Sequence, residues 1–269
     1  MKERITTALV MIAIVIGVIF FVPILFAPLV AVVLGVSIWE WCRIAQLRQS
    51  NSYLVAGATI ILWVLATNFP LVLSLLLVLS IAHYVYAVHL IRQYEKIDNY
   101  RIHRGYLRVS GPVILSAMAA TLIYIFDYSL DVPGGEDPLT LLFVILVIAV
   151  ADSAAYFAGR FFGKHKLAPR VSPNKTIEGL IGGFLGVIVF VCLAQSMVEG
   201  WYLPLPKLLL IALVAAAASV IGDLFVSIVK RQNHIKDTSQ ILPGHGGVLD
   251  RIDGQLAGIP VFYLLQQFS

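Results

Sequence analysis

The sequence predicts an all-α fold, a polytopic transmembrane bundle of about nine helices. Of its 269 residues, 59% are hydrophobic and only 13% are charged, whereas an ordinary soluble domain carries about 25% charged residues. Its apolar runs repeat at lengths near the ~20 residues that a helix needs to cross a ~30 Å hydrocarbon core. These observations exclude an ordinary soluble protein and indicate an integral membrane protein.

Nine apolar runs are the candidate spans, and they cover residues 5–22, 23–41, 53–69, 70–91, 109–127, 138–159, 177–198, 207–229 and 255–268. Pro23 and Pro70 separate neighbouring runs, because proline resists continuing a helix. The first run is longer than the 7–15 residue core of a signal peptide, which favours a retained helix over a cleaved signal. The last run, 255–268, is the shortest, and as a helix it would reach only about 21 Å.

The distribution of Lys and Arg predicts the orientation in the membrane. With the N-terminus inside, 18 of the 19 Lys and Arg residues fall in the inner segments 1–4, 42–52, 92–108, 160–176 and 230–254. The outer segments instead carry Asp127, Asp131, Glu136, Asp137 and Glu199. Because cytoplasmic loops collect basic residues, we predict a cytoplasmic N-terminus, an outer C-terminus, and two polar loops, 160–176 and 230–254, on the cytoplasmic side.

This charge pattern also bears on partners and organisation. The net charge of +4 gathers at the ends of apolar runs, which favours a membrane protein over a nucleic-acid-binding one. We divide the chain into N-terminal transmembrane helices, 1–108, and a C-terminal catalytic region, 109–269. The basic segment 92–108, which holds three tyrosines, is either an interfacial helix that contacts anionic headgroups or an ordinary inner loop.

The densest polar segment runs from Ser227 to Asp253, beside long apolar runs. Just before and at its start, Asp223, Ser227, Lys230 and Arg231 have the spacing of one helical face that leads to the cytoplasmic surface. A carboxylate inside a membrane span is costly and usually faces a partner or a wet cavity. In the simplest alternative, Asp223 only pairs with Lys230.

A glycine-rich turn follows Lys236 in this segment, with the sequence Pro-Gly-His-Gly-Gly over 243–247. Gly246 and Gly247 allow backbone amides to approach an anion closely. His245 either donates to a phosphate or moves a proton, or it is a turn residue without a chemical role.

Two carboxylates and an arginine end the segment. Asp250 and Asp253 lie three residues apart and share one face if this stretch is helical, with Arg251 between them. Hard oxygen ligands of this kind suit Mg²⁺, which commonly binds one or two carboxylates together with substrate phosphates. Asp223 and Asp250 are therefore the predicted metal ligands.

The second inner loop precedes an apolar run and offers groups that bind anions. These groups adjoin a predicted helix N-terminus, which is a natural anion site. The predicted substrate-binding residues carry hydroxyl, amide, ammonium and carboxylate groups, and they are Ser172, Asn174, Lys175, Thr176 and Glu178. The spacing of a Walker A loop is missing. Alternatively, this loop is solvated and its charges only set the topology.

Together the two loops resemble a known family. The pattern S-x-x-K-R-x(4)-K-D-x-S-x-x-L-P-x-H-G-G-x-x-D-R-x-D over 227–253, with S-P-N-K-T-I-E-G at 172–179 and D-S-A-A-Y-F-A-G-R at 152–160, is similar to that of the phosphatidate cytidylyltransferases, or CDP-diacylglycerol synthases. The resemblance implies transfer of CMP from CTP to phosphatidate with release of pyrophosphate, in the phospholipid biosynthesis of the inner membrane. It also implies Mg²⁺, with a second cation such as K⁺ as a further candidate, and a homodimer.

The resemblance further implies roles for individual residues. Asp223 and Asp250 hold metal; Lys230, Arg231 and Arg251 bind phosphates; and Asp253 is either a ligand or an orienting residue. The 172–176 stretch helps to hold the triphosphate. Two rival functions stay open, a CTP-using kinase of a polyprenol or phytol and a transporter of a phosphorylated solute. The motif of the CDP-alcohol phosphotransferases is absent from the sequence.

Overall fold

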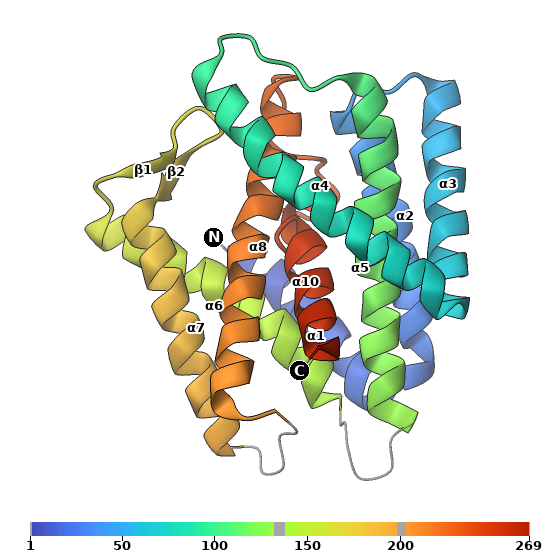
Figure 1. Cartoon of the computed structure of the whole chain (residues 1–269), viewed down its shortest axis with the longest axis vertical. Coiled ribbons are helices and arrows are strands. Elements are labelled where there is room, and N and C mark those ends of the chain that lie inside the picture. Colours follow the sequence, from blue (N-terminus) through green and yellow to red (C-terminus); the bar gives the residue numbers. More distant parts are fainter. Residues whose placement is uncertain (1, 132–137, 198–202, 269) are drawn as a thin grey trace.

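The computed structural model describes residues 2–131, 138–197 and 203–268. The predictions that concern Glu136, Asp137 and Glu199 fall outside these ranges, and so does the side chain of Asp131. Most of the described chain is helical (Figure 1).

The long helices follow the apolar runs of the sequence. They are α1 (Lys2–Phe21), α2 (Phe26–Ile44), α3 (Gln49–Asn68), α4 (Pro70–Lys96), α5 (Arg104–Asp131), α6 (Leu139–Phe162), α7 (Ile177–Met197), α8 (Leu205–Arg231) and α10 (Gln255–Gln267). The short elements are the 3-10 turn η1 (Pro23–Leu25), α9 (Leu249–Ile252), and the strands β1 (Lys166–Ala168) and β2 (Ser172–Thr176).

The polytopic membrane fold is confirmed in its class. Seven helices of the described chain, α2 to α8, are long and apolar enough to cross a membrane. The described apolar part of α1, Thr6–Phe21, is shorter, and α10 has 13 residues. Nine spans therefore stay a prediction, and so does the division of the chain at residue 108.

Two predicted inner loops contain more regular structure than expected. Segment 92–108 is mostly helical, because α4 continues to Lys96 and α5 begins at Arg104. Neither alternative describes it in full, since its ends belong to α4 and α5 and residues 97–103 connect them. Segment 160–176 forms an antiparallel hairpin in which Lys166 pairs with Thr176 and Ala168 with Ser172. This hairpin is the one departure from an all-α fold among the described residues.

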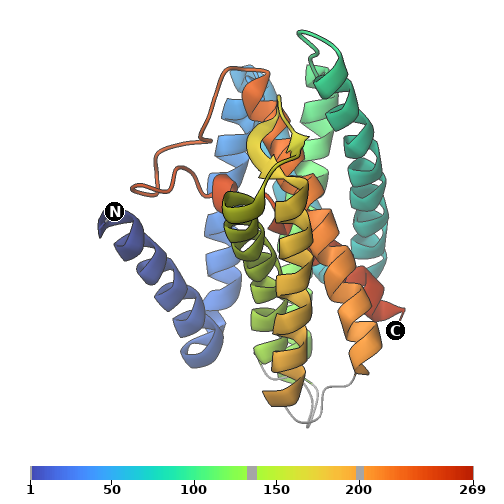
Figure 2. The ribbon, with the colours of Figure 1, turned by 90° about the vertical axis from the view of Figure 1, so that its left-hand side faces the viewer.

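The two polar segments meet at one end of the bundle, as predicted. The β1–β2 hairpin lies at the same end as the connection between α8 and α9, although more than 50 residues separate them in sequence (Figures 1 and 2). Helix α1 leans away from the other helices (Figure 2). Thr7 Oγ1 donates a hydrogen bond to Pro243 O at 3.0 Å, which ties α1 to this connection.

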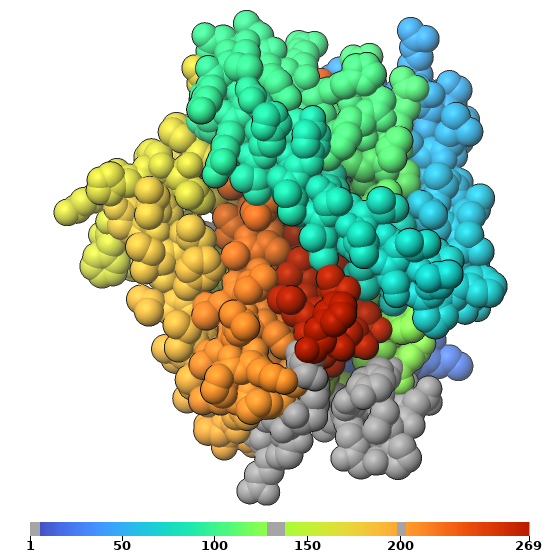
Figure 3. Space-filling view, in the orientation of Figure 1, coloured from blue at the N-terminus to red at the C-terminus, as the bar shows by residue number. Residues whose placement is uncertain are grey.

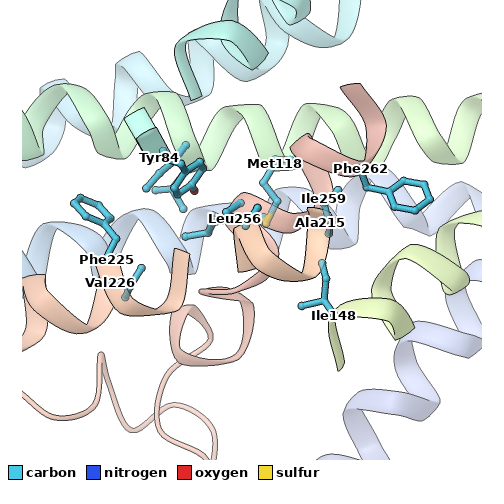
Figure 4. Close-up of a cluster of buried hydrophobic side chains, with 14 of the residues drawn as sticks. Tyr84, Met118, Ile148, Ala215, Phe225, Val226, Leu256, Ile259 and Phe262 are labelled. Atoms are coloured by element: carbon cyan, nitrogen blue, oxygen red, sulfur yellow. The ribbon is translucent and has the colours of Figure 1, made fainter. Parts of the chain in front are cut away.

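Apolar packing of α5, α6, α8 and α10 forms the centre of the bundle. Met118, Ala215, Leu256 and Phe262 are at most 1% exposed, and they converge there (Figure 4). On the face shown in Figure 3, α10 fills the space between α8 and α4. The first half of α10 is buried, from Leu256 to Pro260, while its second half reaches this face.

The outer surface is apolar, as a lipid-facing surface should be. On α7 the exposed side chains repeat every fourth residue, at Ile181, Leu185, Val189 and Leu193, which places them on one stripe of the helix. A lipid environment removes the cost of exposing such a stripe.

Helices α6 and α7 approach closely because small residues line their contact. A Cβ on Gly182 would lie 2.1 Å from the Ala158 Cβ, and a Cβ on Gly186 would lie 2.5 Å from the Ala154 Cβ. Stripes of small residues allow membrane helices to pack backbone against backbone. The β1–β2 hairpin connects the end of α6 to the start of α7.

We predict that Gly182→Ala lowers the melting temperature of the detergent-solubilised protein by several degrees. The added methyl overpacks the α6–α7 contact, and overpacking costs about 1–3 kcal/mol. Gly57→Ala is the matched control, because a Cβ on Gly57 meets nothing within 4 Å. Thermal unfolding of both variants tests this packing, and equal melting temperatures would contradict it.

Candidate active site

A cavity of about 420 Å³ opens between the hairpin, α6, α8 and α9. It brings together residues from both predicted polar segments. The predicted residues that line it are Ser172, Asn174, Lys175, Thr176, Asp223, Lys230, Asp250, Arg251 and Asp253. The walls thus combine carboxylates with ammonium and guanidinium groups, a composition suited to phosphates and a metal ion.

Helix α8 carries the carboxylate of Asp223 into the bundle. Because α8 ends at Arg231, Asp223 lies about 12 Å below that end at 1.5 Å rise per residue. Its Oδ2 lies 2.5 Å from Lys175 Nζ of the hairpin, and its Oδ1 accepts a hydrogen bond from Ser227 Oγ at 3.2 Å. The alternative pairing of Asp223 with Lys230 is therefore wrong.

Lys230 pairs instead with Asp250, and this pair is buried. The Nζ–Oδ1 distance is 2.7 Å, and the two side chains are 9% and 5% exposed. The other oxygen of Asp250, Oδ2, accepts hydrogen bonds from the backbone amides of Thr238 at 2.8 Å and Gly247 at 3.0 Å. Burial alone would raise the pKa of Asp250, but the Lys230 ammonium and these amides outweigh it and lower that pKa.

Asp253 is in the opposite electrostatic situation. Burial raises the pKa of Asp253 well above its usual value, and the neighbouring Asp223 carboxylate raises it further. Burial alone would lower the pKa of Lys175, but the carboxylates of Asp223, Asp152 and Asp253 together raise it. The carboxyl groups of Asp152, Asp223 and Asp253 thus surround the Lys175 ammonium, and these four side chains form the floor of the cavity.

Several predicted residues lie outside the cavity lining. Arg231 faces a second cavity on the other side of the hairpin turn. Glu178 binds the hairpin itself, since it accepts hydrogen bonds from the amides of Lys164 and His165. Lys236 is exposed, and Ser227 reaches the cavity only through Asp223.

The glycine-rich turn shapes the site through its backbone. Gly246 has a φ of +85°, a left-handed conformation that favours glycine, and its amide donates to Leu242 O at 3.2 Å. Gly247 directs its amide at Asp250 instead. His245 is half-buried in this turn and donates its amide to Leu242 O at 2.9 Å. The turn thus positions Asp250, while a role of His245 in chemistry stays a prediction.

A buried glutamate on α2 holds the whole segment in place. Glu40 is 0% exposed and accepts hydrogen bonds from Thr238 Oγ1 at 3.0 Å, Val248 N at 3.0 Å and Leu249 N at 2.6 Å. Ser239 Oγ donates to it as well. Because Thr238 and Gly247 also bind Asp250, Glu40 positions Asp250 through the segment 238–249.

A family comparison agrees with this geometry. The model of the Cytidylyltransferase family matches residues 2–269, so the match covers the helices, the hairpin and both polar segments. The chain belongs to the cytidylyltransferase family. Its similarity to two relatives extends over nearly the same length.

Three relatives illustrate that similarity. The phosphatidate cytidylyltransferase of Haemophilus influenzae is 34% identical over 97% of both chains. That of Pseudomonas aeruginosa is 38% identical over 98% of this chain and 96% of its own. That of Bacillus subtilis is 42% identical over 54% of both chains.

Sequence reasoning missed Glu40 in this cytidylyltransferase, although a signal was present. Glu40 is a single carboxylate in an apolar run, and such residues usually have a buried partner or a function. Asp152 and Asp237 also line the cavity. Asp152 is one of the intramembrane carboxylates that the sequence singles out, at the start of the 152–160 motif, whereas Asp237 was missed, because it belongs to a polar segment in which no spacing distinguishes it.

We predict that Glu40→Ala opens the 238–249 segment. Four donors lose the Glu40 carboxylate, and two of them, Ser239 Oγ and Leu249 N, are buried with no second acceptor within the described chain. A hydrogen bond to a charged group is worth about 1.5–3 kcal/mol, so the segment opens at least about tenfold more often. Limited proteolysis within residues 232–248 measures this opening.

Ser37→Ala is the matched control for this experiment. Ser37 lies one turn earlier on α2, is also 0% exposed, and donates only within its own helix, to Val33 O at 2.7 Å. Equal cleavage rates in Glu40→Ala and Ser37→Ala would show that Glu40 does not hold the segment.

Proposed function

We propose that this chain is an integral-membrane nucleotidyltransferase, a CTP:phosphatidate cytidylyltransferase. It transfers CMP from CTP to phosphatidate and yields CDP-diacylglycerol and pyrophosphate, in phospholipid biosynthesis. The observation that carries this conclusion is the similarity, over nearly the whole chain, to relatives named phosphatidate cytidylyltransferase. A cavity with phosphate-binding side chains at one end of a membrane bundle supports it.

The reaction needs positioning and charge neutralisation more than proton transfer. A phosphate oxygen of phosphatidate attacks the α-phosphorus of CTP, the new P–O bond forms, and the bond to the β-phosphate oxygen breaks to release pyrophosphate. A phosphate monoester has a second pKa of ~6, so the attacking oxygen is already ionised at neutral pH. A strong general base is therefore not required.

The hairpin and the end of the motif supply the phosphate-binding groups. Lys175 and Arg251 both line the cavity, and Arg251 is exposed there, so it is free to bind a phosphate. Lys175 is 25% exposed beside Asp223 and can exchange that carboxylate for a phosphate oxygen. Lys230 is more enclosed, so we assign it first to the positioning of Asp250 and second to phosphate binding.

The side chains of the cavity floor fit Mg²⁺ chemically. They are hard oxygen donors, and the carboxylates of Asp152, Asp223, Asp250 and Asp253 all line the same cavity. Among the described residues no ready-made group of three ligands exists, which agrees with a cation that binds together with substrate phosphates. When bound, Mg²⁺ would neutralise charge on those phosphates.

We assign Asp223 and Asp250 as the Mg²⁺ ligands, with Asp253 as a third ligand or an orienting group. Among the described residues, Asp223 Oδ2 pairs only with Lys175, so it is the more available ligand. Asp250 accepts hydrogen bonds at both oxygens and would bind a metal ion in addition to them or in place of one. A second cation such as K⁺ would compensate the remaining charge on the floor.

We predict that Asp223→Asn weakens Mg²⁺ affinity at least tenfold in calorimetric titrations with CTP present. The variant loses a charged ligand that the cavity exposes, and Asp250→Asn should lose affinity as well. Asp98→Asn is the matched control, because Asp98 lies outside this cavity and binds Arg170. Unchanged affinity in Asp223→Asn would refute the ligand assignment.

We predict transfer of label from CTP labelled on the α-phosphate into the lipid fraction. The purified protein is incubated in mixed micelles with phosphatidate and Mg²⁺, and pyrophosphate release should match the label in the lipid. A CTP-using kinase would instead leave the label in water-soluble CDP while a lipid alcohol becomes phosphorylated. Folded protein that forms neither product would indicate the transporter.

We further propose an inner-membrane protein with a cytoplasmic N-terminus, an outer C-terminus and a cytoplasmic active site. The collection of basic residues at the hairpin end supports this orientation. The C-terminus can reach the outer side although α10 is short, because the backbone of Asp253 lies beside Gly222, already within the bundle. Reporter fusions at each terminus test the orientation, and cross-linking in membranes tests the homodimer.

A further inference from the structure

A second cavity of about 250 Å³ adjoins the hairpin turn and is distinct from the candidate active site. Three segments build it: the end of α4 with the connection that follows, the hairpin turn, and the turn after α8. We call it the arginine cavity and define it by Tyr94, Tyr100, Arg101, Arg170, Arg231 and His234.

The arginine cavity carries an excess of positive charge. Three guanidinium groups line it against one carboxylate, that of Asp98, which pairs with Arg170 at 2.8 Å. Within the described chain, Arg231 donates one hydrogen bond, from Nε to Val171 O at 3.4 Å, so its Nη atoms remain able to bind a ligand. Arg101 is exposed at the rim. Guanidinium groups in this arrangement suit a phosphate, which they bind through paired N–H donors.

The position of the cavity matches the level of lipid headgroups. It lies where the candidate span Pro70–Lys96 ends, at the same end of the bundle as the hairpin (Figure 1). Tyr94 and Tyr100 are of the type that collects at membrane–water interfaces, and Ile97 is 48% exposed beside them. Basic pockets at this depth bind anionic headgroups.

Two residues at the arginine cavity, Val171 and Arg231, are direct chain neighbours of residues that line the candidate active site. Val171, which accepts the bond from Arg231, precedes Ser172 of the active-site lining. Arg231 itself follows Lys230, which binds Asp250. In addition, Glu95 of α4 accepts hydrogen bonds from the amides of Arg170 and Val171, both at 3.0 Å. A ligand between Arg170 and Arg231 would therefore steady the hairpin that lines the active site.

We propose that the arginine cavity binds the phosphate group of an anionic molecule other than the two substrates, and that this binding stabilises the hairpin. The ligand is either a phospholipid headgroup in the membrane surface or a free phosphate ester. The effect on catalysis rests on the proposed function, whereas binding itself does not.

Thermal unfolding in detergent tests binding without any need for activity, because a ligand of the native state raises the melting temperature. The additions are phosphatidylglycerol, neutral phosphatidylcholine and soluble glycerol phosphate. We expect the melting temperature to rise with phosphatidylglycerol but not with phosphatidylcholine. A rise with glycerol phosphate alone would identify a free phosphate ester as the ligand.

The variants Arg101→Gln and His234→Gln assign the effect to the cavity. Arg101→Gln should weaken the apparent affinity for the phosphate ligand about fivefold, the effect of one Lys or Arg at a lipid surface. His234→Gln should also weaken it, because His234 lines the cavity and its imidazole carries an N–H donor. Arg104→Gln is the matched control, because Arg104 is also exposed nearby but lies outside the cavity. The proposal would be overturned if phosphatidylglycerol raised the melting temperature equally in the wild type and all three variants, or did not raise that of the wild type.

Measuring CMP transfer in the same samples separates this proposal from the proposed function. Phosphatidylglycerol should increase turnover of the wild type and of Arg104→Gln more than that of Arg101→Gln. If no transfer occurs but the variant-sensitive rise in melting temperature remains, the arginine cavity is confirmed as a phosphate site and only the proposed function fails.

Discussion

The geometry of the candidate active site depends on the hydrogen bonds between the Glu40 carboxylate and the segment 238–249. The segment 238–249 has no helix until α9, and Glu40 binds both of its ends, through Thr238 and Ser239 on one side and Val248 and Leu249 on the other. A buried carboxylate is stable only when donors surround it, so the segment and the glutamate stabilise each other. The same contact joins α2, near the start of the chain, to a segment about 200 residues later.

The ion pairs of the cavity prepare it for ligands of both charges. Asp223 with Lys175 and Asp250 with Lys230 bring opposite charges to one floor. A buried charge needs a partner, and these pairs supply one before any substrate binds. Asp223 with Lys175 is the more exposed pair, and under the proposed function Asp223 would bind a metal ion and Lys175 a phosphate oxygen in place of each other. The enclosed pair, Lys230 with Asp250, keeps the framework of the motif in place.

Neighbouring residues of one motif face different cavities, which spacing alone did not predict. Lys230 and Arg231 are adjacent, and the helical-face argument placed both with Asp223. The structure directs Lys230 to Asp250 and Arg231 to Val171. Likewise, Glu178 satisfies the amides of the hairpin. Such choices depend on which partner lies within reach after the helices have packed.

The amino-acid sequence by itself determined the membrane class, the helical runs, the meeting of the two polar segments and most of the cavity lining, because hydropathy and charge act locally along the chain. Only the tertiary structure decided the β1–β2 hairpin, the ion-pair partners, the separate direction of Arg231 and the role of Glu40. Glu40 and Leu249 are more than 200 residues apart, and no local pattern encodes which distant donors a buried carboxylate will find. Packing of the helices brings them together.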